Sequence, residues 1–177
     1  MGKAVLLSIR PTWANEIDRG TKTVEVRKSL PTIDGYPFKP FKVYLYCTQG
    51  KDRLVDIIRD GDDIYGDTYH GKPVFITYPE CGYGYRVKRK TVFGEFLCDK
   101  SEVLNNLFDW DDTECGYHLP YNGESCLTKE DLEEYGKGKR LWGWHISNYK
   151  YYKEPKSLAD FGLTRPPQSW CYVEELE

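Results

Sequence analysis

Two short stretches near the start of the chain alternate between apolar and polar residues, and they constrain the fold more than any other feature. Residues 5–9 place apolar side chains at every second position, with Ser8 and Arg10 on the other side. Residues 22–28 alternate in the same way, with valines on one side and Thr23, Glu25 and Arg27 on the other. Both stretches therefore predict half-buried strands.

The segment between these stretches has the signals of a helix. Pro11 suits the first helical turn, and Gly20 suits the position just past a helix end. Later apolar runs predict strands at 43–47, 91–98, 141–152 and 170–173, and helices beginning near Leu54, Ser101 and Thr128. About six strands with short helices, in no regular β-α-β order, predict an α+β domain whose strands form a small barrel.

The length of 177 residues suits one domain, so we expect residues 1–177 to fold as a single unit. Residues 60–90 are rich in Gly, Asp, Tyr and Pro, which is typical of long loops or a hairpin. The chain contains no P-loop, and the glycines of 82–84 lack the flanking strand and helix of a dinucleotide-binding loop. A nucleotide site of either of these types is excluded.

The charge and cysteine content of the chain limit the ligands and partners that it can bind. The net charge is −3, which has the wrong sign for a protein that coats nucleic acid, so a nucleic-acid site would have to be local. We expect no signal peptide and no membrane span, and therefore a cytoplasmic protein. The six cysteines form no C-x-x-C pair, so reduced thiols are expected. A zinc site that uses Cys81, Cys115, His118 and Cys126 matches no common spacing, and no metal or other cofactor is expected.

The charged side of the second strand is the best candidate site. Glu25 and Arg27 would lie about 6 to 7 Å apart on one face, near Thr23, with Lys22 at the junction between helix and strand. A carboxylate can accept from the amino group of a base, Arg can bind phosphate, and a desolvated Lys can act as a base. An exposed strand face with a simple ion pair is the other interpretation of this pattern.

The order of strand, helix and G-x-K-T-x-E-x-R resembles the signature of the ASCH domain, a branch of the PUA-like superfamily. The resemblance covers most of the chain and is weakest over residues 60–90, which resemble a lineage-specific insertion. The C-terminal R-P-P-Q-S-W-C-Y-V is similar to the end of ASCH proteins common in phages and bacteria. The segments that carry it are residues 6–11, 20–27, 43–48, 92–96, 143–147 and 165–173.

The resemblance implies a β-barrel flanked by helices, with a cleft beside the strand at 22–27. It also implies RNA or a (possibly modified) nucleotide as the partner. Lys22, Glu25 and Arg27 match the motif, and Ser8 and Arg10 would lie on the adjoining strand. Together with His145, these are the predicted ligand-binding residues.

Two other functions remain open. The acetylcytidine amidohydrolases of this superfamily use a threonine nucleophile where this chain has Glu25. Such an enzyme would depend on Lys22, Thr23 and Glu25, with Glu124 near the position of their catalytic glutamate. A single-strand ribonuclease that uses Lys22, His145 and a tyrosine is a second enzymatic alternative. A protein-interaction module without catalysis is the third class.

Other groups have weaker signals. His145 lies on the small, polar side of the strand at 141–152, where a histidine can line a cleft or simply bond to a neighbour. The interleaved tyrosines and lysines of 149–153 are typical of a base-stacking surface or of an edge strand. Four cations form a candidate phosphate patch: Arg86, Lys88, Arg89 and Lys90.

Overall fold

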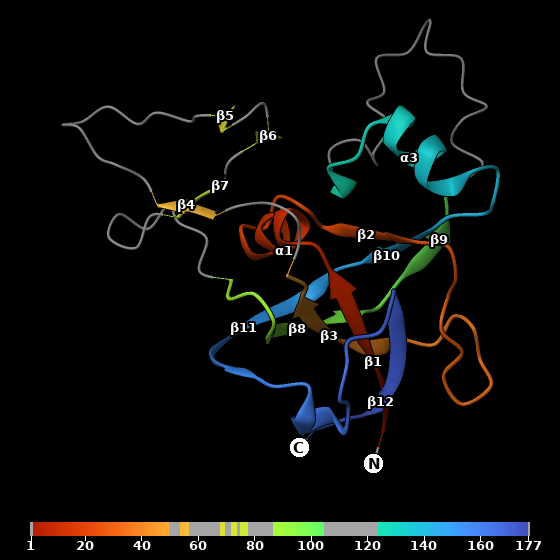
Figure 1. The fold of residues 1–177 in the computed structure, drawn as a ribbon. Coiled ribbons are helices and arrows are strands. Elements are labelled where there is room, and N and C mark those ends of the chain that lie inside the picture. The colour runs from red at the N-terminus through yellow and green to blue at the C-terminus, as the bar shows by residue number, and fades with distance from the viewer. Residues whose placement is uncertain are drawn as a thin grey trace, which may run out of the picture.

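The computed structural model describes residues 2–49, 54–56, 68–69, 72–73, 75–77, 87–104 and 124–176. Among these residues it contains two α-helices, one 3-10 helix and several strands (Figure 1). The helices are α1 (Pro11–Asp18), α3 (Lys129–Gly136) and η2 (Ala159–Phe161). The longer strands are β1 (Lys3–Ile9), β2 (Val24–Arg27), β3 (Phe41–Cys47), β8 (Val92–Cys98), β9 (Ser101–Val103), β10 (Trp142–His145), β11 (Ser147–Lys156) and β12 (Trp170–Glu174).

These eight strands form two sheets. The larger has the order β11-β8-β3-β1-β12, with β1 and β3 parallel and the other pairs antiparallel, and the smaller has the order β2-β10-β9. Short strands form two further pairs, β4 (Leu54–Asp56) with β7 (Phe75–Thr77) and β5 (Thr68–Tyr69) with β6 (Lys72–Pro73).

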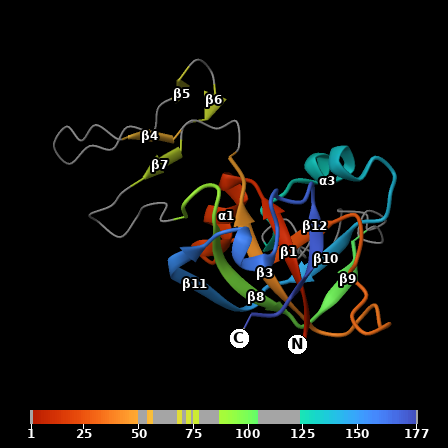
Figure 2. The same cartoon turned by 60° about the horizontal axis from the view of Figure 1, so that its bottom comes forward.

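A two-stranded ribbon connects the two main sheets. β8 leads almost directly into β9 and β10 into β11, and these strands pair with each other at both ends of the ribbon (Figure 2). The ribbon therefore leaves the larger sheet and joins the smaller one, which gives the strands the strong curvature expected of a small barrel. The predicted α+β class is confirmed, with eight strands in the two main sheets where about six were expected.

α1 follows the sequence signals closely. Pro11 opens it, and Gly20 adopts a left-handed conformation with φ of 77° two residues after its end. Ala14 and Ile17 are buried and pack into the main core. The helix is therefore fixed on the sheet by its apolar side, and the turn at Gly20 directs the chain into β2.

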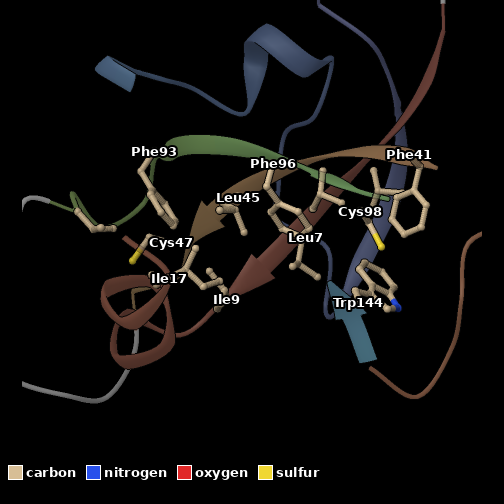
Figure 3. Close-up of a cluster of buried hydrophobic side chains, with 14 of the residues drawn as sticks. Leu7, Ile9, Ile17, Phe41, Leu45, Cys47, Phe93, Phe96, Cys98 and Trp144 are labelled. Carbon is tan, nitrogen blue, oxygen red and sulfur yellow. The ribbon is translucent and has the colours of Figure 1, made fainter. Parts of the chain in front are cut away.

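The main core lies on the α1 side of the larger sheet. Figure 3 shows side chains from β1, β3 and β8 meeting those of α1 and Trp144 of β10. Ala4 and Leu6 belong to a second cluster on the other face of β1, where Phe161 and Leu163 pack against it. The strand at 5–9 is therefore buried on both faces, and the expectation that it is half-exposed was wrong. The C-terminal segment supplies the covering layer.

The first residues of two expected helices are strands, and the rest of both segments lies largely outside the described residues. Residues 101–103 pair with β10 as β9, and 54–56 pair with β7 as β4. The third expected helix is confirmed as α3, whose cap at Thr128 exchanges hydrogen bonds with Asp131. Much of the predicted insertion at 60–90 lies outside the described residues. No helix in the described parts of the chain is long and apolar enough to span a membrane.

Gly94 is required by a close approach of two strands. A Cβ built at this position would lie 2.6 Å from the carbonyl oxygen of Lys150 on β11. We expect Gly94→Ala to lower the free energy of unfolding by about 1–3 kcal/mol because a backbone must move. Urea denaturation checks this. Gly136→Ala is the control, since its Cβ would meet only the Leu141 side chain, at 3.3 Å. Equal effects of the two substitutions would contradict the prediction.

Candidate functional site

Lys22 is the centre of the site and is almost completely buried. Its backbone N–H donates to the Glu16 carbonyl at the end of α1, which fixes the residue at the start of β2. Its Nζ donates to the carbonyl oxygen of Ser125 at 2.5 Å and lies 3.5 Å from Oε2 of Glu25. The ring of Trp13 lies 5.4 Å from the same nitrogen. A buried amine is thus held by a carbonyl, a carboxylate and an aromatic ring.

Glu25 connects Lys22 to Arg27. Its side chain is 4% exposed, and its Oε1 lies 2.9 Å from Nη1 of Arg27. Arg27 also donates through Nη2 to the carbonyl oxygen of Ser8, at 2.9 Å. The Arg27 Nε is buried and has no hydrogen-bond partner among the described residues. Two cations and one carboxylate leave the cluster with one excess positive charge, and one donor remains unused.

Burial dominates the protonation of Lys22. It lowers the pKa of Lys22 below the usual 10.5, and the nearby Arg27 lowers it further. The carboxylate of Glu25 opposes this shift by favouring the charged amine. Burial also raises the pKa of the neighbouring Cys126 thiol, while Lys22 acts in the other direction. A lowered pKa in a buried amine is typical of functional lysines, although structural ion pairs can also produce it.

Strand register decides which residues share the face of Glu25. On β10, Trp144 pairs with Glu25 and Trp142 pairs with Arg27, so these side chains lie on one face. His145 pairs with Val24 and projects from the opposite face. There it contacts Glu102 through Nε2. The structure therefore does not bring the predicted ligand residue His145 together with the Lys22, Glu25 and Arg27 side chains.

The remaining residues predicted near the site serve mainly through their backbones. The Thr23 side chain is exposed, while its N–H donates to Glu124 O and its carbonyl accepts from Ile146 N. Ser8 is buried, and its hydroxyl donates to the carbonyl oxygen of Pro167. Arg10 is exposed at the start of α1. Thr23 is therefore not arranged as a nucleophile beside the Lys22 amine.

The described part of the predicted phosphate patch lies beside the end of β3. Lys88 and Lys90 are exposed, and Arg89 donates through Nη1 to the carbonyl of Gln49 at 2.8 Å. Arg86 lies outside the described residues.

The proposed zinc ligands Cys81, Cys115 and His118 also lie outside the described residues. Within the described part of the chain, no group of three or more His, Cys, Asp or Glu side chains is placed to hold a metal ion.

Sequence reasoning missed the residues that enclose Lys22 from other elements. Trp13 carried a helix signal only, and Ser125 is 103 positions away in the sequence. Neither position has a local pattern that points to Lys22. The carbonyl of Ser8 was missed as well, because a backbone acceptor leaves no mark on the sequence.

Comparison with solved structures identifies the fold of the chain. The sequence matches no protein-family model, and a search of curated proteins finds no match. An ASCH structure from Zymomonas mobilis matches with a TM-score of 0.57 and 17% identity over 97% of this chain and 88% of that one. Variants of that protein with single substitutions match with TM-scores of 0.56 and 0.57, at 16% and 17% identity. They also match 97% of this chain, and 89% and 91% of theirs. The chain therefore has the fold of the ASCH domain.

Proposed function

We propose that the chain is an ASCH-domain protein that binds RNA or a nucleotide at Lys22, Glu25 and Arg27. The observation that carries the proposal is the burial of three charged side chains with one excess positive charge. Burying an ion lowers the stability of the fold by roughly several kcal/mol, even when the ion is paired. A cluster that only stabilised the fold could be replaced by apolar residues of the same size. An anionic ligand supplies a reason for the extra cation.

The geometry suggests how the ligand is held. Arg27 is the most accessible member of the cluster, with 13% of its side chain exposed, and a guanidinium can donate to a phosphate or carbonyl oxygen. Lys22 adds positive charge behind it, and half-buried Trp13 offers a ring on which a base can stack. Glu25 keeps the two cations in position, so it acts as a positioning residue.

A hydrolase using the same site is the second candidate, and the lowered pKa of Lys22 favours it. A neutral amine can accept a proton from a nucleophile, which a fully charged lysine cannot do. The exposed side chain of Thr23 argues against the threonine-dependent amidohydrolase mechanism, because nucleophile and base must lie about 3 Å apart. A water nucleophile or a substrate hydroxyl is compatible with this arrangement. Binding is therefore proposed as the primary function.

A ligand titration tests the proposal. Nucleosides, nucleotides and short RNAs should raise the melting temperature of the wild type when they bind, because they stabilise the native state by mass action. We expect Lys22→Met and Arg27→Lys to weaken binding about 10- to 100-fold, the range for charge-assisted hydrogen bonds. Lys100→Met, at a lysine whose side chain is 63% exposed and that belongs to no candidate site, is the matched control.

Three outcomes separate the alternatives. Circular dichroism establishes first that each variant is folded. A panel that never stabilises the wild type overturns the proposal and favours the protein-interaction module. Equal affinities for Arg27→Lys and Lys100→Met would move the ligand away from this cluster. Turnover of acetylated cytidine or RNA during the titration, lost in Lys22→Met, would favour the hydrolase.

A further inference from the structure

Aromatic rings and cations gather on the surface beside Arg27. We propose that this surface binds the continuation of a single-stranded RNA whose one nucleotide occupies the Lys22, Glu25 and Arg27 cluster. The inference rests on the proposed function and specifies its ligand as a polynucleotide strand. The surface is called the basic-aromatic patch, and its members are Tyr36, Phe38, Arg140 and Trp142.

Trp142 connects the cluster to the patch. It is the β10 partner of Arg27 and lies on the same face of the smaller sheet. Its ring centroid is 6.0 Å from that of Phe38, and the guanidinium of Arg140 lies 5.8 Å from it. A strand bound at Arg27 therefore has two aromatic rings and a second cation close to it.

The aromatic side chains of the patch are unusually accessible. Tyr36 and Phe38 are 67% and 64% exposed, and they are the most exposed large hydrophobic residues among the described positions. Pro37 and Pro40 restrict the backbone of the segment that carries them. The two rings are thus presented in a segment that has already lost part of its conformational entropy. Base stacking on such rings tolerates any sequence, because every base has a π-face.

The charge of the patch favours a phosphate backbone over a protein partner. Residues 27–40 and 137–142 contain six cations and one acid, whereas the whole chain has a net charge of −3. Asp34 pairs with Lys39, so its charge is already compensated. The cations are Arg27, Lys28, Lys39, Lys137, Lys139 and Arg140.

The acidic helix α3 lies next to the basic-aromatic patch and carries the opposite charge. Glu130, Asp131, Glu133 and Glu134 lie on it and are exposed. These carboxylates repel phosphate, so the strand is directed from Arg27 toward Phe38 and away from α3. The amine of Lys28 lies 4.7 Å from the ring of Tyr135, which packs against the cluster that contains Val26, so Lys28 lies on the α3 side and outside the patch.

Fluorescence anisotropy with a mononucleotide and with single-stranded RNAs of up to about ten nucleotides tests the inference. Wild-type affinity should rise with length. We expect Phe38→Ala to weaken binding of the longer RNA about 5- to 150-fold, the fold-change that corresponds to one lost stacking contact. Its affinity for the mononucleotide should stay unchanged. Arg140→Ala should reduce the slope of log affinity against log salt by ~0.7, the value for one phosphate contact.

The control is Lys100→Ala, which removes one cation that is 63% exposed and belongs to no candidate surface. It should bind the longer RNA like the wild type. Affinity that does not depend on length overturns the inference and leaves the proposed function standing. Failure to bind both the mononucleotide and RNA overturns both. Wild-type self-association that Phe38→Ala abolishes, without length-dependent RNA binding, would make the patch a contact between copies of this chain.

Discussion

Replacing Glu25 with alanine is expected to lower the free energy of unfolding by about 3–5 kcal/mol, because it leaves a buried cation without its counter-charge. Among the described residues, Lys22 would keep the carbonyl of Ser125 and the ring of Trp13 as partners. Arg27 would lose its 2.9 Å contact and keep the carbonyls of Ser8 and Val26. Guanidinium denaturation of the wild type and Glu25→Ala measures the difference.

The double substitution Lys22→Met/Glu25→Leu separates charge from packing. It removes both buried ions and fills their space with apolar atoms, so most of the stability should return. Glu25→Gln keeps the shape and removes only the charge, and it should fall between the wild type and Glu25→Ala. A loss below about 1 kcal/mol for Glu25→Ala would contradict the prediction, since that is the value expected of an exposed ion pair.

These stability variants also bear on function. A double variant that is as stable as the wild type but no longer binds a nucleotide would mean that the charges serve ligand recognition. The cluster would then resemble other functional sites, where charged groups are kept in spite of their cost to the fold.

Local signals predicted the elements that depend on nearby residues. The helix at Pro11 and the cap at Thr128 follow from hydrogen bonds within one turn, and both appear as expected. The helix expected after Ser101 failed because long-range pairing prevailed: Ser101 and Val103 pair with Trp144 and Trp142. The strand at 5–9 was expected to have one polar face, but the distant C-terminal segment covers it. A strand's second face is therefore poorly predicted without its neighbours.

In the candidate site, too, the residues close in sequence were predictable and the distant ones were not. Lys22, Glu25 and Arg27 lie within six residues, on β2 and just before it, so the sequence could place them together. The enclosing groups, such as the carbonyl of Ser125, come from distant parts of the chain. The alternation of apolar and polar residues along β10 predicted that His145 lies on the polar face of that strand. Only the pairing of β10 with β2 shows that this face is opposite to the face of Glu25. The alternation of apolar and polar residues could not predict the pairing register between strands that are distant in the sequence.

The stability of the protein is expected to depend on pH through Lys22, with a sign that follows from its burial. The pKa of Lys22 is lowered from 10.5 in the native state, so the unfolded chain holds this proton more tightly. The free energy of unfolding should therefore rise with pH from the lowered native pKa up to about 10.5, by at most ~1.4 kcal/mol per pH unit. Below that window both states carry the proton, and Lys22 contributes no pH dependence.

Other groups titrate in the same range, so the measurement is the difference between the wild type and Lys22→Met across the window. That difference should move in favour of the wild type as the pH rises. Lys153→Met, at an exposed position of β11, controls for the loss of one positive charge. In a Glu25→Ala background the rise should begin at lower pH, because Glu25 is the main group that favours the charged amine. A flat difference would mean that Lys22 holds its proton equally in both states, and the amine would then be a poor base for any hydrolase at this site.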